Sequence, residues 1–184
     1  LNYDNSFGKH GISGLLVGYL RNYDVTANSD QLSKGTALIS TLPTRNMGIS
    51  GRVAYNFDSR YFLEGNFGYN GSERFAANHR FGFFPSIGTG WLVSNEKFWQ
   101  GSLDKVISKL KLKATYGLVG NDNLSNDPAE RYFYLSNVTM ANSTYGYTFG
   151  QNWSSTQSGV SIDRYANPDI SWEMSTKTNF GFEL

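Results

Sequence analysis

Long runs of alternating apolar and polar residues constrain this chain more than any other feature. In the run at 49–57, Ile49, Val53 and Tyr55 fall on one face of an extended strand and Arg52 falls on the other. Each run holds about 10 to 13 residues, roughly twice the usual globular strand and enough for a tilted strand to cross a bilayer. The predicted strand cores are 10–20, 47–57, 61–70, 83–93, 109–119 and 173–183.

The connections between these strands alternate in length. "DSR" at 58–60 forms a tight turn, whereas 26–45, 71–80 and 121–171 are long and polar. Short turns on the periplasmic side and long loops outside are typical of outer-membrane barrels. The connection at 94–108 departs from this pattern, because it is long but lies on the short-turn side. Its "NEKFWQGSLDKVI" is consistent with a brief amphipathic helix.

Aromatic residues are abundant, with 13 Phe, 12 Tyr and 4 Trp, and they gather near the ends of the runs. Interfacial girdles of membrane barrels occupy that position. The examples are Tyr55, Phe57, Tyr61, Tyr69 and Trp91. The apolar residues predicted to face outward are Ile49, Val53, Leu63, Phe67, Leu112, Tyr116, Phe180 and Phe182.

Composition excludes several other classes of protein. The longest apolar stretch, "GLLVGYL" at 14–20, is too short for a membrane-spanning helix. Sixteen basic residues against 15 acidic ones, with no long run of one sign, argue against a nucleic-acid partner. The chain has no cysteine, and His10 and His79 lack metal-ligand spacing to other residues. We therefore expect no enzyme activity, no metal and no cofactor.

Alternation alone leaves two architectures open. One is an all-β membrane barrel, and the other is a secreted β-sandwich or β-helix whose apolar face meets a second sheet. Because about six strands cannot close a wide barrel, the chain is expected to be incomplete on the barrel interpretation.

Four blocks in this chain resemble one known family. They are "GRVAYNFDSRYFLEGNFGYNGSERF" at 51–75, "RFGFFPSIGTGWLVSNEKFW" at 80–99, "LKLKATYGLVGND" at 110–122 and "NPDISWEMSTKTNFGFEL" at 167–184. In this order they resemble the barrel of SusC/RagA-type TonB-dependent outer-membrane transporters of Bacteroidetes. The blocks span nearly half of the chain, whereas 123–166 matches poorly, as an extracellular loop would.

The resemblance implies a barrel of about 22 strands, plugged by an N-terminal domain and located in the outer membrane of a Gram-negative bacterium. It implies a SusD-like surface lipoprotein as a lid, import of oligosaccharide or peptide cargo, and energy delivered through TonB. Residues 1–184 are then an internal barrel segment, a long antiparallel meander of about six strands in contact with outer-membrane lipid. The plug domain and the TonB-contacting box are expected to lie outside this chain. The alternative function is a secreted β-rich module that binds carbohydrate or a surface.

Aromatic residues in the long loop are the candidate contacts for cargo or for the lid. Aromatic rings stack on the apolar faces of sugars, and the Asn and Gln residues nearby can bind hydroxyl groups. The same segment can instead form an extra extracellular hairpin. The candidates are Tyr132, Tyr134, Tyr145, Tyr147 and Trp153.

Charged residues on the alternate face are predicted to point into the lumen. The lysines and the arginine among them can pair with Glu64, Glu183 and plug residues, or they can polarise the channel for anionic cargo. The predicted lumen-facing charges are Arg52, Glu64, Lys111, Lys113 and Lys177.

Overall fold

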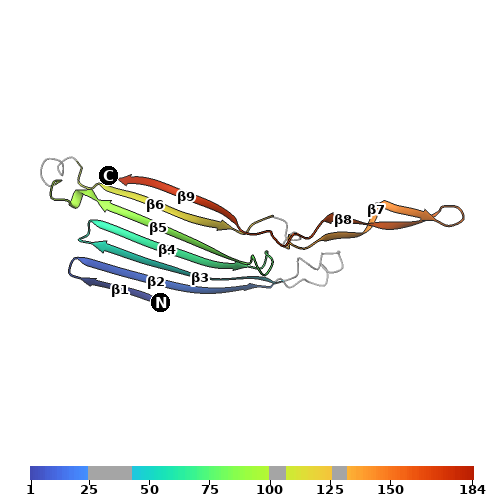
Figure 1. The fold of residues 1–184 in the computed structure, drawn as a ribbon, viewed down its shortest axis with the longest axis horizontal. Coiled ribbons are helices and arrows are strands. Elements are labelled where there is room, and N and C mark those ends of the chain that lie inside the picture. The colour runs from blue at the N-terminus through green and yellow to red at the C-terminus, as the bar shows by residue number, and fades with distance from the viewer. Residues whose placement is uncertain (25–42, 100–106, 126–131) are drawn as a thin grey trace.

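The computed structural model describes residues 1–24, 43–99, 107–125 and 132–184. Seven antiparallel strands form one sheet in the order β1-β2-β3-β4-β5-β6-β9, and β7 and β8 form a separate hairpin (Figure 1). The sheet strands are β1 (Asn2–Phe7), β2 (His10–Tyr23), β3 (Thr44–Phe57), β4 (Tyr61–Ser72), β5 (Phe81–Leu92), β6 (Lys111–Asn121) and β9 (Glu173–Glu183). The hairpin strands are β7 (Asn137–Phe149) and β8 (Ser155–Arg164).

All six predicted strands are present, and the all-β antiparallel meander is confirmed. Strands β2 to β6 and β9 are 11 to 14 residues long. Strand β1 was not predicted, because its sequence "NYDNSF" lacks a clear apolar face. The sheet therefore has seven strands rather than about six. Strand β6 pairs with β9 rather than with its neighbour in sequence, since the β7–β8 hairpin lies between them.

Cross-strand registers place the predicted outward residues on one face of the sheet. One row runs from Val53 through Gly65 and Ile87 to Tyr116. Side chains alternate along a strand and paired residues share a face, so the two predicted sets lie on opposite faces. We call them the apolar face and the polar face. The apolar face includes Ile49, Val53, Leu63, Phe67, Ile87, Leu112, Tyr116, Phe180 and Phe182.

Two rows of rings border the apolar face. At the short-turn end, Phe57, Tyr61 and Trp91 follow one another with ring centroids about 6.4 and 6.5 Å apart. At the long-loop end, Tyr69 stacks on Phe81 at 5.2 Å. Eight residues along β4 separate Tyr61 from Tyr69, or about 27 Å at about 3.4 Å per residue. Strands of outer-membrane barrels are tilted by about 35 to 45°, so this length corresponds to a height of about 20 Å, close to the apolar band of about 25 Å in such barrels.

The turns at one end are short. Gly8 has a φ of 60° in the β1–β2 turn. Asp58 and Ser59, at φ values of 54° and 53°, make the tight β3–β4 turn that "DSR" predicted. In the longer β5–β6 connection, η2 (Val93–Asn95) is a single 3-10 turn, and 96–99 continue as turns rather than as the predicted amphipathic helix. Residues 100–106 of that connection lie outside the described residues.

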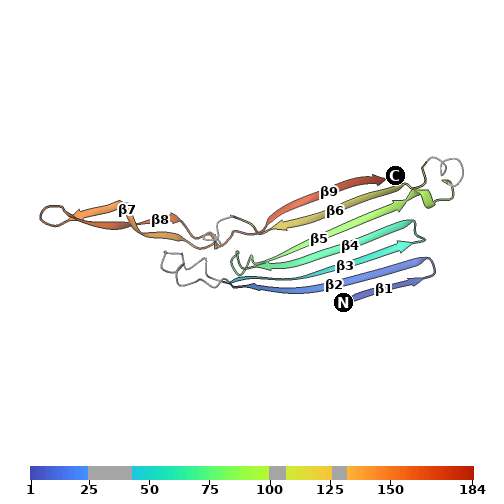
Figure 2. The same ribbon diagram turned by 180° about the vertical axis from the view of Figure 1, so that it is seen from behind.

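The opposite end carries the long connections, and from it the β7–β8 hairpin extends beyond the sheet (Figure 2). A small core lies at this end. Phe75 is fully buried, and its ring centroid is 5.3 Å from that of Trp172, which also contacts Phe84 at 5.1 Å. The Trp172 indole N–H donates to the carbonyl oxygen of Arg80 at 3.2 Å. These contacts join the β4–β5 loop to the segment before β9.

Candidate functional site

The structure separates the five aromatic candidates into two groups. Tyr132 and Tyr134 lie before the hairpin, with ring centroids 6.1 Å apart, and they line a cleft of about 900 Å³ at the long-loop end of the sheet. Tyr145, Tyr147 and Trp153 belong to the hairpin, where Trp153 contacts Tyr147 at 6.2 Å and is 65% exposed. The loop therefore forms the extra hairpin that the sequence left open.

The β7–β8 hairpin has a hydrogen-bonded polar side near its base. The Thr139 hydroxyl donates to Asp163 at 2.6 Å, and the Ser161 hydroxyl donates to the same carboxylate at 3.1 Å. Val138 and Ile162 are paired on the opposite side of the ribbon, next to Thr139 and Ser161, and are 40% and 49% exposed. Because a two-stranded ribbon alone is only marginally stable in water, this apolar side favours contact with another surface.

The charged candidates lie on the polar face, and several are paired there. Arg52 bonds to Glu64 at 2.5 Å, Lys113 bonds to Glu183, and the Lys111 ammonium lies 4.6 Å from the ring centroid of Phe62. Lys177 lies opposite Gly117 in the ladder, and its ammonium makes no hydrogen bond or ion pair with the part of the chain that the structure describes. Exposed pairs of this kind contribute about 0 to 1 kcal/mol each, so they organise the charge of this face more than they stabilise it.

A second cleft of about 570 Å³ opens at the long-loop end of the polar face. The Tyr19 hydroxyl donates to the side-chain oxygen of Asn70 at 3.3 Å within it. Rings and amides thus meet in one concavity, a combination suited to polar organic ligands. Sequence analysis missed this group, although aromatic residues on the polar face of "GYLRNY" were a usable signal. Its lining includes Tyr19, Tyr23, Asn46, Asn70, Asp122 and Trp172.

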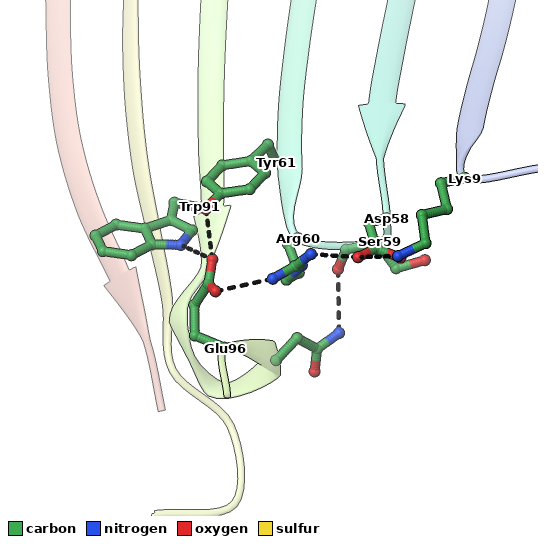
Figure 3. A network of polar contacts seen from close by, with 8 residues as sticks. Lys9, Asp58, Ser59, Arg60, Tyr61, Trp91 and Glu96 are labelled. Atoms are coloured by element: carbon green, nitrogen blue, oxygen red, sulfur yellow. Dashed lines mark hydrogen bonds and ion pairs between the residues drawn. The ribbon is translucent and has the colours of Figure 1, made fainter. Parts of the chain in front are cut away.

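Glu96 is the centre of a polar network at the short-turn end (Figure 3). Its carboxylate, 8% exposed as a residue, accepts hydrogen bonds from the Tyr61 hydroxyl at 2.6 Å and the Trp91 indole at 3.2 Å. Arg60 bonds to the other carboxylate oxygen at 2.9 Å. The hydroxyl of Tyr61, followed by the Trp91 and Arg60 bonds, holds the pKa of Glu96 below its ordinary value. Sequence analysis missed this role, because the segment had the pattern of a helix.

The same network joins three connections of the sheet. Arg60 also bonds to Asp58, whose carboxylate accepts from Lys9 at 3.2 Å. The Asn95 amide donates to the carbonyl oxygen of Ser59 at 3.1 Å. The Arg60 hydrogen bond, then the Lys9 bond, lowers the pKa of Asp58. The β1–β2 turn, the β3–β4 turn and the β5–β6 connection are therefore held together by charged hydrogen bonds.

Acid should weaken this network selectively. A carboxylate whose folded pKa is depressed adds stability above its unfolded pKa and loses it as the pH falls through the folded pKa. For Glu96 the loss begins below the ordinary value of 4.5. We expect the wild-type protein to lose thermal stability more steeply than Glu96→Gln as the pH falls from about 5.5 to about 3, measured by heat-modifiable gel mobility. Lys97→Gln in the same connection is the control, and equal pH slopes for Glu96→Gln and wild type would contradict the assignment.

In the part of the chain that the structure describes, no helix is long and apolar enough to cross a membrane. Within the described residues, no group of three or more His, Asp or Glu side chains is arranged to hold a metal ion.

The chain is similar to curated TonB-dependent receptors. It is 32% identical to TonB-dependent receptor SusC of Bacteroides thetaiotaomicron over 143 residues, which cover 77% of this chain and 13% of that protein. It is 27% identical to TonB-dependent receptor P3 of Formosa agariphila over 204 aligned residues, which cover all of this chain and 19% of the relative. No family model matches the sequence. The chain thus spans less than a fifth of the length of these relatives.

Solved structures agree with the sequence comparison. The RagAB peptide transporter superposes with a TM-score of 0.64 at 26% identity, over 98% of this chain and 20% of that chain. The "open-open" state of the RagAB peptide importer gives a TM-score of 0.66 at 25% identity. The chain is therefore a β-barrel segment of a TonB-dependent receptor. More particularly, its relatives identify it as a segment of the SusC/RagA type.

Proposed function

We propose that this chain forms part of the wall of an outer-membrane nutrient importer. The observation that carries the proposal is the apolar face, which continues across the sheet and lies between two rows of aromatic residues. Val53, Ile87 and Phe180 on this face are 61%, 54% and 82% exposed. Membrane lipid is the solvent that such a face requires. The polar face, with its charges and its cleft, then lines the lumen.

Cargo and partners follow from the relatives. RagAB is named as a peptide transporter, and the SusC/RagA resemblance implies peptide or oligosaccharide import, so peptide or oligosaccharide is the proposed cargo. The polar-face cleft is the proposed contact for this cargo. The exposed apolar side of the β7–β8 hairpin is the proposed contact for a SusD-like surface lipoprotein. The plug domain and the site that meets TonB are proposed to lie in parts of the receptor outside this chain. Neither catalysis nor a cofactor is part of this function.

The test is extraction of the natural full-length protein that contains this chain. An importer should remain with the outer-membrane fraction through high salt and alkaline carbonate, and detergent should release it as a heat-modifiable barrel. A secreted β-rich module should be free in the medium or be released by salt. Release without detergent would overturn the importer proposal and favour the secreted module.

A further inference from the structure

An apolar groove crosses the long-loop half of the apolar face. It has a volume of about 570 Å³, and its lining includes Gly18, Leu20, Met47, Ile49, Tyr69 and Phe81. Gly18, Ile49 and Tyr69 are register partners, so the missing side chain of Gly18 lowers the surface between larger neighbours. No atom lies within 4 Å of the position that a Cβ at Gly18 would occupy. The groove is thus an open channel with apolar walls.

The groove continues into the 900 Å³ cleft at the end of the sheet. Leu20, Met47 and Phe81 line both spaces. Beyond these residues the lining becomes basic, with three arginines against Glu73 as the one acid. The arginines of the lining are Arg21, Arg45 and Arg80, and Tyr132 and Tyr134 contribute aromatic lining from the segment before the hairpin. Apolar walls thus give way to net positive charge toward the long-loop end.

Two of these arginines have donors available for a ligand. Arg45 uses its Nε to donate to Asn22 at 3.3 Å, and no other bond is formed by its guanidinium within the described residues. The Nε of Arg80 is buried and has no hydrogen-bond partner, and it is the only such side-chain atom in the part of the chain that the structure describes. Buried polar groups without partners are rare and costly. The Arg80 Nε has no exposed surface and is not itself a ligand contact, but the terminal guanidinium nitrogens of Arg45 and Arg80 form no hydrogen bond within the described residues. Guanidinium groups bind phosphate oxygens in pairs of hydrogen bonds, so these two side chains of the cleft lining suit an anionic ligand.

We propose that the cleft and the groove together bind one phosphate-bearing lipid of the surrounding membrane. Its phosphate lies at Arg45 and Arg80, and one acyl chain occupies the groove beside Gly18. The basic cleft suits the headgroup and the apolar groove suits the acyl chain. The cleft lies at the level of Tyr69 and Phe81, and aromatic girdles of membrane barrels lie at the depth of the lipid headgroups. The Glu73 carboxylate would repel a phosphate, but three arginines leave the lining with a net positive charge. The inference rests on the proposed function, since it requires the apolar face to contact lipid.

The headgroup contact is tested with Arg45→Gln/Arg80→Gln in the natural full-length transporter. After release from its own membranes in mild detergent, native mass spectrometry measures the retained phosphorylated lipid. The wild type should retain one such lipid, and the double variant should lose about tenfold or more in occupancy. Lys97→Gln/Lys109→Gln removes the same charge at the other end of the sheet and should retain the lipid. Equal retention by the wild type and the arginine variant overturns the proposal.

Gly18→Leu tests the acyl-chain contact. The leucine should fill the groove without a clash at its Cβ and without any change in charge, and lipid occupancy should again fall about tenfold. Loss in the arginine variant with full retention in Gly18→Leu also overturns the proposal, because a free phosphate needs the cleft alone. A wild-type protein that leaves the membrane without detergent contradicts the importer function itself, which is a distinct result.

Discussion

Arginine in place of Ile87 should prevent most of the protein from assembling as a folded barrel. Ile87 lies on the apolar face of β5, four positions from Phe83 and four from Trp91, and is 54% exposed. It is therefore near the middle of the band between the aromatic rows. A cation at the lipid-facing midplane costs about 2 to 4 kcal/mol. Heat-modifiable mobility of the full-length protein in outer membranes measures the folded fraction.

Asn179→Arg is the matched control for this experiment. Asn179 lies on the polar face and is paired with Thr115. The residue before it, Thr178, is the register partner of Tyr116, which pairs with Ile87 on β5. The two arginines thus lie in neighbouring rows, two strands apart, on opposite faces of the sheet. Asn179→Arg should assemble as the wild type does. If Ile87→Arg assembles equally well at matched expression, the apolar face does not contact lipid.

Truncation of Phe75 should detach the β4–β5 loop from the segment before β9 and expose the loop to protease. Phe75 is fully buried beside Trp172, and deleting a buried phenylalanine ring costs about 3 to 5 kcal/mol. The loss falls on contacts that join the β4–β5 loop to the segment before β9, whereas the backbone bonds of the sheet persist. We expect Phe75→Ala to assemble as a barrel but to be cleaved by external protease at 73–80 in whole cells.

Phe75→Leu serves as the comparison, because it retains most of the buried volume and should remain largely protected. Tyr116→Ala removes a ring from the apolar face, where Tyr116 is 54% exposed, and should leave the loop resistant. Equal protease resistance of Phe75→Ala and the wild type would show that the contacts of Phe75 and Trp172 do not hold this loop.

The alternation of apolar and polar residues was sufficient to predict six strands of the sheet and the face on which each of their side chains lies. An extended strand alternates with a period of two, so "RVAYNF" and "KLKLKATY" carry both the element and its orientation. The same pattern failed for β1, whose "NYDNSF" is polar on both faces and is ordered by pairing with β2. Within 95–107, whose spacing was consistent with a brief helix, the described residues 96–99 form a bend and a turn, and 100–106 lie outside the described residues. There, the bonds of Glu96 to Tyr61, Trp91 and Arg60 are formed instead.

The candidate site was less predictable than the fold. Tyr132 and Tyr147 belong to one aromatic-rich stretch of sequence, yet the first lines the cleft beside the sheet and the second lies on the hairpin. Pairing of the polar-face cations with Glu64 and Glu183 was one of two predicted roles, and the structure pairs Arg52 with Glu64 and Lys113 with Glu183. The shared cleft of Arg45 and Arg80 was not predicted, because the two residues are 35 positions apart in the chain and only the folded sheet brings both into one lining.

The sequence by itself determined the long strands, their two chemically different faces and the tight turn at 58–60, because these depend on contacts between near neighbours. Only the tertiary structure decided the pairing of β6 with β9, the joining of three connections around Glu96 and the placement of a basic cleft above an apolar groove. Each of these depends on residues far apart in the chain. Alternation along one strand carries no information about which distant segment will lie beside it.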